Sequence, residues 1–181
     1  PFSLLQVIDE LKNIFISTVK EKDLSIRIEL IDVVHEYIIC DKMRISQIFI
    51  NIVSNAIKYT NPKGIITIKV IEEPSNDDTM ASFKFSIKDT GIGMTDEFKK
   101  NIFEPFARED RLSLSRIEGT GLGMSITKKI IDLMNGTIKV NSTLGVGSEF
   151  IVSLRLKIAN DYKTNIENED NNNLKISGKR I

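Results

Sequence analysis

Two stretches of alternating apolar and polar residues restrict the folds open to this chain. The segments "IITIKVIEE" (65–73) and "SFKFSIKD" (82–89) follow the period of a strand that buries one face, and a short polar connection separates them. Strands joined so closely pair antiparallel. Two further strands, "TIKVNS" (137–142) and "EFIVSLRL" (149–156), repeat the arrangement. The chain is therefore predicted to build a sheet largely from antiparallel pairs.

Helical segments are interspersed with these strands. Apolar residues recur at helical spacing over 3–22, and further helices are predicted over 42–58 and 121–134. Shorter strands are predicted at 24–31 and 37–40. Helices mixed with adjacent antiparallel strands indicate the α+β class, here a two-layer α/β sandwich whose mixed, mostly antiparallel sheet carries helices on one face.

The charge balance narrows the choice of partners. Lys and Arg together number 25, Asp and Glu together number 25, and the net charge is zero with the one histidine neutral. We therefore expect neither nucleic acid nor a membrane surface as a direct partner. The single cysteine, Cys40, is predicted to be a small buried hydrophobe in a reducing compartment. No apolar run approaches the ~20 residues that span a bilayer, and we expect a cytoplasmic domain.

The two ends of the chain suggest a longer parent protein. Pro1 is neither a start methionine nor part of a signal peptide, so we expect a piece of a longer chain, which leaves room for a membrane anchor elsewhere in the parent. Residues 158–173 are rich in Asn and charge and too polar to pack, which predicts a linker. The final residues, 174–181, become strand-like again.

The helix over 42–58 carries a stripe of amides. In "QIFINIVSNAIKYT" (47–60), Gln47, Asn51 and Asn55 recur every fourth residue among apolar residues, so they lie on one side of the helix. A buried amide without a partner costs about 1–3 kcal/mol. The stripe is either one wall of a functional site or a row of amides that only cap neighbouring loops.

Three glycine-rich stretches follow this helix. "DTGIGM" (89–94) comes directly after a strand, "GTGLGM" (119–124) precedes a helix, and "GVGSEF" (145–150) leads into the last strand. Glycine lets the backbone approach a ligand closely, and N–H groups at the start of a helix favour phosphate. Each stretch alone could be an ordinary turn, and none matches a P-loop or a dinucleotide fingerprint.

Taken in order, these motifs resemble the catalytic ATP-binding domain of a sensor histidine kinase. The order is the amide helix, then D-x-G-x-G, F-E-P-F, G-T-G-L-G-M and G-x-G-S-x-F. That domain belongs to the superfamily of gyrase, the heat-shock chaperone ATPases and the mismatch-repair ATPases, and the resemblance implies a Bergerat-type ATP-binding fold over residues 1–157. The sequence of residues 118–150 is most similar to that of hybrid kinases, which carry a receiver domain after the catalytic one. Residues 174–181, "LKISGKRI", resemble the first strand of a receiver domain, so such a domain is expected to begin there.

The resemblance implies roles along the amide helix and the first glycine stretch. Asp89 is expected to recognise adenine, because a carboxylate only accepts hydrogen bonds and so suits the exocyclic amine and repels the guanine carbonyl. Asn55 is expected to be the direct ligand of Mg²⁺, and Asn51 to ligate the ion or to orient one of its waters. Lys58 is expected to pair with phosphate, and Tyr59 to lie against the nucleotide.

The later motifs complete the implied site. The segment 102–106 is expected to anchor a lid over 107–118, in which Arg108 contacts phosphate or the transition state. Arg111 and Arg116 are equally well explained as solvated loop charges. The residues expected to bind ATP are Asn51, Asn55, Lys58, Tyr59, Asp89, Gly91, Ile92, Gly93, Gly119, Thr120, Gly121, Leu122, Gly123 and Ser148. The residues expected to act in catalysis are Asn51, Asn55, Lys58 and Arg108.

The residue type at position 51 distinguishes phosphoryl transfer from ATP hydrolysis within the superfamily. The resemblance places a glutamate, the general base for water, at this position in the related ATPases. An amide has no useful basicity, so Asn51 can position a metal but cannot activate water. We therefore predict a two-component protein-histidine kinase that uses ATP and Mg²⁺ and transfers the γ-phosphoryl group to a histidine.

The acceptor histidine is predicted to lie outside this chain. His35 is the only histidine, yet "HEYIICD" runs into a strand and lacks the family's acceptor pattern of Glu, a variable residue, Arg, Thr and Pro. His35 is thus expected to be a loop or strand-end residue. The predicted partners are a phosphoacceptor and dimerisation helical domain upstream of Pro1 and a response-regulator receiver domain, fused C-terminally in a hybrid kinase.

The sequence is also compatible with two other functions. One is an ATPase of the same superfamily in which nucleotide drives dimerisation, and Asn51 argues against it. The other is a nucleotide-sensing interaction module without a chemical step, and Asn55, Asp89 and the glycines argue against it. Vigorous hydrolysis by the isolated chain would favour the first, and failure to bind ATP would favour the second.

Overall fold

The structure, a computed structural model, describes residues 1–108 and 120–159. Its strands are β1 (Phe2–Ser3), β2 (Ser25–Ile31), β3 (Tyr37–Ile39), β4 (Ile65–Glu73), β5 (Met80–Asp89), β6 (Thr137–Thr143) and β7 (Gly147–Ile158). Its helices are α1 (Leu4–Glu21), α2 (Lys42–Tyr59), α3 (Asp96–Asn101) and α4 (Gly123–Leu133). The lid residues 109–118, Gly119 and nearly all of the predicted linker and receiver start lie outside the described residues.

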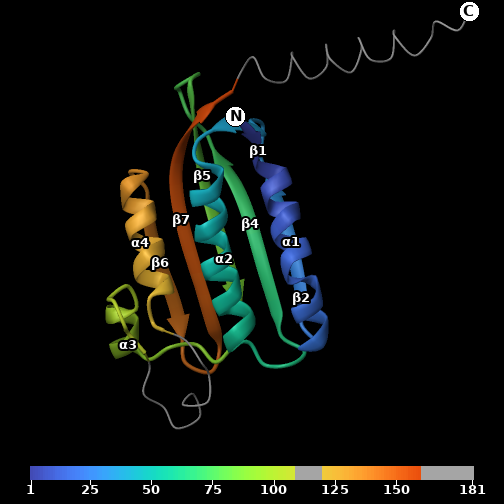
Figure 1. Cartoon of the computed structure of the whole chain (residues 1–181), viewed down its shortest axis with the longest axis vertical. Coiled ribbons are helices and arrows are strands. Elements are labelled where there is room, and N and C mark those ends of the chain that lie inside the picture. Colours follow the sequence, from blue (N-terminus) through green and yellow to red (C-terminus); the bar gives the residue numbers. More distant parts are fainter. Residues whose placement is uncertain (109–119, 160–181) are drawn as a thin grey trace, which may run out of the picture.

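The strands form one seven-stranded sheet in the order β1-β3-β7-β5-β4-β2, with β6 also paired to β7. Among the described strands, β2 and β4 run parallel and every other pair is antiparallel. Helices α1, α2 and α4 lie against one face of this sheet, and α3 lies near the end of β6 (Figure 1). This arrangement confirms the predicted two-layer fold with a mixed, mostly antiparallel sheet.

The structure contains two elements that the sequence did not predict. Strand β1 has two residues, too few for any period, and it is held by pairing Phe2 with Ile38 of β3. Helix α3 has the sequence "DEFKKN", in which Phe98 is the only apolar residue, so no helical stripe is visible. It begins because the hydroxyl of Thr95 accepts a hydrogen bond from the N–H of Phe98 (3.2 Å).

Side-chain caps fix where the two long helices begin. The hydroxyl of Ser3 accepts from the N–H of Gln6 at the start of α1 (3.1 Å). The carboxylate of Asp41 accepts from the N–H groups of Met43 and Arg44 at the start of α2 (3.0 and 3.2 Å). Such caps satisfy N–H groups that have no partner within the helix. They fix the first turn of each helix, and the apolar residues that follow at helical spacing face the sheet.

Helix α2 lies at the centre of the helical layer, between α1 and α4 (Figure 1). Its apolar side is buried, and the ring of Phe49 meets the ring of Phe85 on β5 edge-on at 5.0 Å. Full burial of such a side chain stabilises the fold by roughly 1.5–3 kcal/mol. The residues of α2 that bury this side are Ile45, Ile48, Phe49, Ile52, Val53, Ala56 and Ile57. The amide stripe is therefore carried by the helix that buries the most side chains among the described helices.

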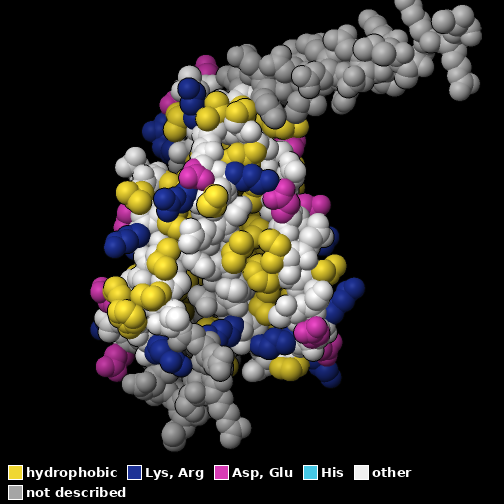
Figure 2. Space-filling view, viewed as in Figure 1, with side chains coloured by type: hydrophobic (Ala, Val, Ile, Leu, Met, Phe, Trp, Pro, Cys, Tyr) yellow, Lys and Arg dark blue, Asp and Glu magenta, His cyan; other side chains and the backbone are white. Residues whose placement is uncertain are grey.

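The balanced charge of the sequence is also visible on the surface, whereas Cys40 is less buried than predicted. On the helical side, acidic and basic side chains are interspersed, and Lys and Arg side chains lie over the C-terminal end of α2 (Figure 2). Cys40 is half-buried against the core rather than fully buried, and desolvation raises the pKa of its thiol to about 11. None of the described helices combines the length and the apolar character needed to cross a bilayer.

Candidate functional site

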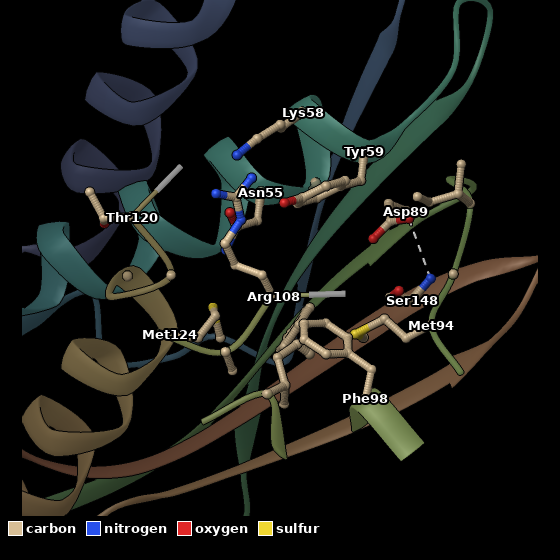
Figure 3. A pocket seen from close by; sticks show the side chains of 18 residues that line it. Asn55, Lys58, Tyr59, Asp89, Met94, Phe98, Arg108, Thr120, Met124 and Ser148 are labelled. Atoms are coloured by element: carbon tan, nitrogen blue, oxygen red, sulfur yellow. Dashed lines mark hydrogen bonds between the residues drawn. The ribbon is translucent and has the colours of Figure 1, made fainter. Parts of the chain in front are cut away.

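A cavity of about 270 Å³ lies beside the C-terminal half of α2 (Figure 3). Its walls come from α2, the end of β5 and the loop after it, α3 and the segment after it up to Arg108, residues 120–121, the start of α4 and the start of β7. The residues of the predicted set that line it are Asn55, Lys58, Tyr59, Asp89, Ile92, Gly93, Arg108, Thr120, Gly121, Gly123 and Ser148. Segments up to 93 residues apart along the chain (from Asn55 to Ser148) thus meet at one place, as the motif order indicated.

Three predicted residues are described but do not line the cavity: Asn51, Gly91 and Leu122. The amide nitrogen of Asn51 donates to the carbonyl oxygen of Gly123 (3.3 Å) and to the hydroxyl of Thr127 (3.0 Å). Asn51 therefore fastens α2 to the first turn of α4, and its role toward a metal stays a prediction. Gly119 lies outside the described residues.

One end of the cavity, which we name the carboxylate end, is formed around Asp89 and Ser148. Asp89 is 6% exposed, and its Oδ1 accepts from the N–H groups of Gly91 (2.8 Å) and Ser148 (3.3 Å). Burial raises the pKa of Asp89, and these two hydrogen bonds oppose the rise. Among the described residues, no group donates to Oδ2, and the carboxylate turns toward the cavity (Figure 3). The cavity therefore presents a buried acceptor to a ligand.

Glycines at the carboxylate end are required by close packing. A Cβ on Gly91 would lie 2.5 Å from the carbonyl oxygen of Tyr59. A Cβ on Gly93, whose φ is +63°, would lie 2.0 Å from the carbonyl oxygen of Thr143. The loop that carries these glycines is held between α2 and the β6–β7 turn, where the N–H of Gly145 donates to the carbonyl oxygen of Ile92 (2.7 Å). The backbone geometry, in addition to any ligand, thus explains the "DTGIGM" stretch.

Ser142 connects three segments at the carboxylate end and was not predicted. Its hydroxyl accepts from the N–H of Met94 (2.9 Å), donates to the carbonyl oxygen of Gly147 (3.0 Å), and lies 2.9 Å from the hydroxyl of Ser148. Ser148 in turn donates its N–H to Asp89. Ser142 therefore helps to fix the backbone around the buried carboxylate. A lone serine on an alternating strand carries no signal of this role.

An apolar wall runs along the cavity, and most of it was also missed. Its side chains come from the ends of two glycine stretches, from α3 and its C-terminal flank, and from β7: Met94, Phe98, Ile102, Met124 and Phe150. Concave sites that bind small molecules combine such apolar surfaces with a few polar groups. A flat aromatic group could lie against this wall and reach Asp89. Four of the five lie in stretches that the sequence analysis singled out: three end a glycine-rich stretch and Ile102 begins the segment 102–106. Their position in those stretches was the available signal.

The opposite end of the cavity, which we name the cationic end, is formed by Asn55, Lys58, Arg108 and Thr120. In Figure 3 these side chains lie on the far side of Tyr59 from Asp89. The ammonium nitrogen of Lys58 lies 5.1 Å from the centre of the Tyr59 ring. This end offers an amide and two cations, which suits an anionic ligand.

The start of α4 adds backbone donors to the cationic end. No side chain among the described residues caps this helix, so its first N–H groups remain available and its dipole favours an anion. The helix begins at Gly123, two residues later than predicted, because the φ of +71° at Gly121 is incompatible with a right-handed helix. At Gly121 a Cβ would also lie 2.8 Å from the backbone of Phe106.

His35 lies far from this cavity. It is in the loop between β2 and β3, as expected, and its Nδ1 lies 2.5 Å from a carboxylate oxygen of Glu72. Glu72 sits on β4 six residues from Ile66, which pairs with Asp89. At about 3.3 Å per residue this is roughly 20 Å along the sheet. His35 and the cavity are therefore at opposite ends of β4.

Comparisons with known proteins agree with this geometry. Residues 40–158 match the family described as histidine kinase-, DNA gyrase B- and HSP90-like ATPase. Hybrid signal transduction histidine kinase B of Dictyostelium discoideum is 38% identical over 159 residues, which cover 88% of this chain and 8% of that protein. Sensor histidine kinase GacS of Pseudomonas protegens is 36% identical, covering 100% and 19%. The chain thus spans less than a fifth of either relative.

Solved structures show the same fold. The catalytic domain of histidine kinase ThkA superimposes with a TM-score of 0.68 at 29% identity, covering 85% of this chain and 95% of that one. Full-length ShkA in complex with AMPPNP gives a TM-score of 0.73 at 26% identity, covering 88% and 31%. The family match, the kinase relatives and the shared architecture together show that this chain belongs to the histidine kinase-, DNA gyrase B- and HSP90-like ATPase family, as an ATP-binding domain of the sensor histidine kinase type.

Proposed function

We propose that this domain binds ATP with Mg²⁺ and transfers the γ-phosphoryl group to a histidine on a separate phosphoacceptor helical hairpin. The observation that carries the proposal is the division of one cavity into a buried carboxylate at one end and an amide with two cations at the other. A nucleotide triphosphate has the complementary pattern, with a planar base that donates hydrogen bonds and a polyanionic tail.

The carboxylate end suits adenine. Asp89 can accept a hydrogen bond from the exocyclic amine, which is the group that distinguishes adenine from guanine at this position. The apolar wall can cover one face of the ring, and Tyr59 can lie against the nucleotide. Because Oδ1 of Asp89 is already bonded to two backbone N–H groups, its second oxygen is presented in a fixed direction. The base is therefore recognised by a group that needs little rearrangement.

The cationic end suits the phosphates and a magnesium ion. The amide oxygen of Asn55 is the kind of hard ligand that Mg²⁺ accepts beside phosphate oxygens and water. When bound, Mg²⁺ would neutralise charge that develops on the phosphates. Lys58 and Arg108 would contact phosphate oxygens, and the backbone from Thr120 to Gly123 would donate N–H groups to them.

The composition of the cavity favours transfer over hydrolysis. Among the described residues that line it, Asp89 is the only acidic one, and it lies at the carboxylate end. Asn51 stands where the resemblance puts the base of the related ATPases, and its amide is committed to α4. No described side chain at the cationic end can take a proton from water at neutral pH. A histidine does not need a base before the attack, because a neutral imidazole nitrogen has a lone pair that can form the bond to phosphorus while the bond to the ADP oxygen breaks. The proton on the other ring nitrogen then leaves to water or to a group of the acceptor hairpin.

The partners follow from this chemistry. The acceptor hairpin must approach the cationic end of the cavity. Phe106 lies at the margin of this end and is 71% exposed. The N–H of Phe106 donates to the carbonyl oxygen of Gly121 (3.1 Å), which ties this exposed ring to the phosphate-binding loop. We infer a cytoplasmic domain within a longer kinase, with the acceptor domain and a receiver domain as its partners. The predicted lid, linker and receiver segments belong to this same proposal.

A labelling experiment tests the proposal. The chain is mixed with γ-labelled ATP and Mg²⁺, with and without a separately made acceptor hairpin, and label is measured on each polypeptide. We expect label on the hairpin alone, and its loss in Asn55→Ala but not in the matched neighbour Ser54→Ala. Rapid release of phosphate without the hairpin would indicate an ATPase. Label on His35 would contradict the assignment of the acceptor, and failure to bind ATP would leave only an interaction module.

A further inference from the structure

We infer that Lys22 is a positioning residue for nucleotide binding, although it follows α1 and is not among the residues that line the cavity. Its ammonium group fixes the C-terminal turn of α2, and through that turn it holds Lys58, Tyr59 and the glycine loop after β5 in place. The inference rests on the proposed function, because the property it concerns is the affinity of the same site for ATP.

The first observation is where the ammonium group points. The Nζ of Lys22 donates to the carbonyl oxygens of Ile57 (2.8 Å) and Lys58 (2.9 Å), and it lies 3.4 Å from that of Thr60. The last four carbonyls of a helix have no partner within the helix. A cation at this end also interacts favourably with the helix dipole. Lys22 thus caps α2 from a position 35 residues earlier in the chain.

The other two carbonyls of this turn have different partners, one of which belongs to the site. The carbonyl oxygen of Ala56 accepts from the N–H (3.1 Å) and the hydroxyl (2.6 Å) of Thr60, which is 1% exposed. The carbonyl oxygen of Tyr59 accepts from the N–H of Ile92 (3.1 Å), a residue of the glycine loop that lines the cavity. The end of α2 is therefore bonded to Lys22 on one side and to the glycine loop after β5 on the other.

Backbone hydrogen bonds join the same segments. The N–H of Lys63 donates to the carbonyl oxygen of Asp23 (2.6 Å), and the N–H of Ser25 donates to the carbonyl oxygen of Gly64 (3.0 Å). The next residue, Ile65, forms two hydrogen bonds with Thr90. The N–H of Thr90 donates to the carbonyl oxygen of Ile65 (3.1 Å), and the hydroxyl of Thr90 accepts from the N–H of Ile65 (2.9 Å). The turn after α1, the turn after α2 and the loop after β5 thus form one connected joint.

This joint links α1 to the affinity of the site. Without the ammonium of Lys22, the carbonyls of Ile57 and Lys58 lose their partners and the last turn of α2 can fray. Lys58 and Tyr59 occupy that turn and line the cavity, and the anchor of Ile92 is the carbonyl of Tyr59. Nucleotide binding would then have to order these groups, and this cost lowers affinity without the loss of any contact to the ligand.

The test compares two lysines of the same region in the full chain. Lys20 lies in the last turn of α1, is exposed, and its side chain forms no hydrogen bond or ion pair with the described residues. We expect Lys22→Met to weaken ATP·Mg²⁺ binding by calorimetry about tenfold, within the usual range of a coupling between separate positions. Lys20→Met should bind as the wild type does. Lys22→Arg, which restores a cation, should recover affinity to within about threefold of the wild type.

Hydrogen exchange provides the second readout and does not depend on whether a variant folds. If Lys22 couples α1 to the site, ATP must by reciprocity protect the joint, so amides of residues 18–25 should exchange more slowly when ATP and Mg²⁺ are added to the wild type. Unchanged exchange there, or unchanged affinity in a folded Lys22→Met variant, would overturn the inference and leave the proposed function intact. If the wild type itself binds no ATP, the proposed function fails first.

Discussion

The two ends of the cavity are constructed in different ways. At the carboxylate end, Asp89 is buried and bonded to backbone N–H groups, and Ser142 fixes the surrounding segments. At the cationic end, Arg108 and Thr120 are exposed, and Lys58 is a long side chain on the last turn of α2. Backbone packing thus determines the geometry of the carboxylate end, whereas the cationic end is formed by side chains on loops and at helix ends.

This difference assigns a separate task to each end. A preformed acceptor binds its ligand with little ordering cost, so the carboxylate end is suited to selecting the base. Immobilising a Lys or Arg side chain costs up to roughly 2 kcal/mol of rotamer entropy, so the cationic end must be ordered by what binds there. Selectivity should therefore depend on Asp89 and its backbone, and the chemical step on the groups around Asn55 and Lys58.

The largest effect is expected when packing at the carboxylate end is disturbed. Gly93→Ala places a Cβ against the carbonyl oxygen of Thr143 at a positive φ and should lower the free energy of unfolding by about 3 kcal/mol. Gly123→Ala at the cationic end, where a Cβ meets nothing closer than 3.9 Å, should change it by less than about 0.5 kcal/mol. Urea unfolding followed by circular dichroism compares them. Equal stability of the two variants would contradict the proposed contrast.

A smaller effect is expected from the cationic end. Asn55→Ala should weaken ATP binding about tenfold or more and remove most of its dependence on Mg²⁺, because a hydrogen bond or ligand to a charged group is lost. Adenosine, which lacks phosphates, should bind this variant as it binds the wild type. Ser54→Ala, at the neighbouring position of α2 and outside the set of residues that line the cavity, is the control. Calorimetry with both ligands checks the division, and parallel losses for ATP and adenosine would refute it.

The pH dependence should identify the carboxylate end. Burial raises the pKa of Asp89, so the folded protein retains this proton at a pH at which the unfolded chain has lost it. The free energy of unfolding should therefore fall as pH rises between the unfolded and the folded pKa, and this component should vanish in Asp89→Asn. ATP binding should strengthen over the same interval as the carboxylate ionises. Denaturant midpoints and calorimetric titrations at several acidic pH values measure both, and identical profiles for the two proteins would contradict the assignment.

The smallest effect is expected at the other end of the sheet. His35→Gln should leave phosphoryl transfer to an acceptor hairpin unchanged, because His35 lies roughly 20 Å from the cavity along β4. Burial alone would raise the pKa of Glu72, but its hydrogen bonds with His35 and the N–H of Val34 hold it lower. Breaking the side-chain bond should cost about 1 kcal/mol or less of stability. Transfer assays and urea unfolding check both statements, and lost transfer would require a new role for His35.

The sequence predicted the parts of this molecule whose signal is local. The alternation in β4 and β5 and the apolar period of α2 predicted the two-layer fold, which the structure confirms. The ordered motifs also predicted which distant segments meet, because glycines and amides were tied to particular strand and helix ends. The roles of these residues toward ATP and Mg²⁺ remain predictions.

The features that were missed depend on contacts between segments. Ser142 reaches Met94 and Ser148 only because the register of β6 on β7 places it there. Lys22 caps a helix that begins 20 residues later in the chain, so no local motif shows it. Phe98 lies on a short helix without a hydrophobic period. Asn51 was expected at the metal, and its bond to the start of α4 becomes evident only when the two helices pack.

The central claim, that a preformed carboxylate selects adenine, is tested most directly by base selectivity. Affinities for ATP and GTP are measured by calorimetry at saturating Mg²⁺ for the wild type and for Asp89→Asn. The amide oxygen can still accept the N–H groups of Gly91 and Ser148, so the fold should persist. We predict that the wild type prefers ATP and that the variant loses about two orders of magnitude of this preference, because a donor now faces the adenine amine. An unchanged ratio of ATP to GTP affinity in a folded Asp89→Asn variant would contradict the account.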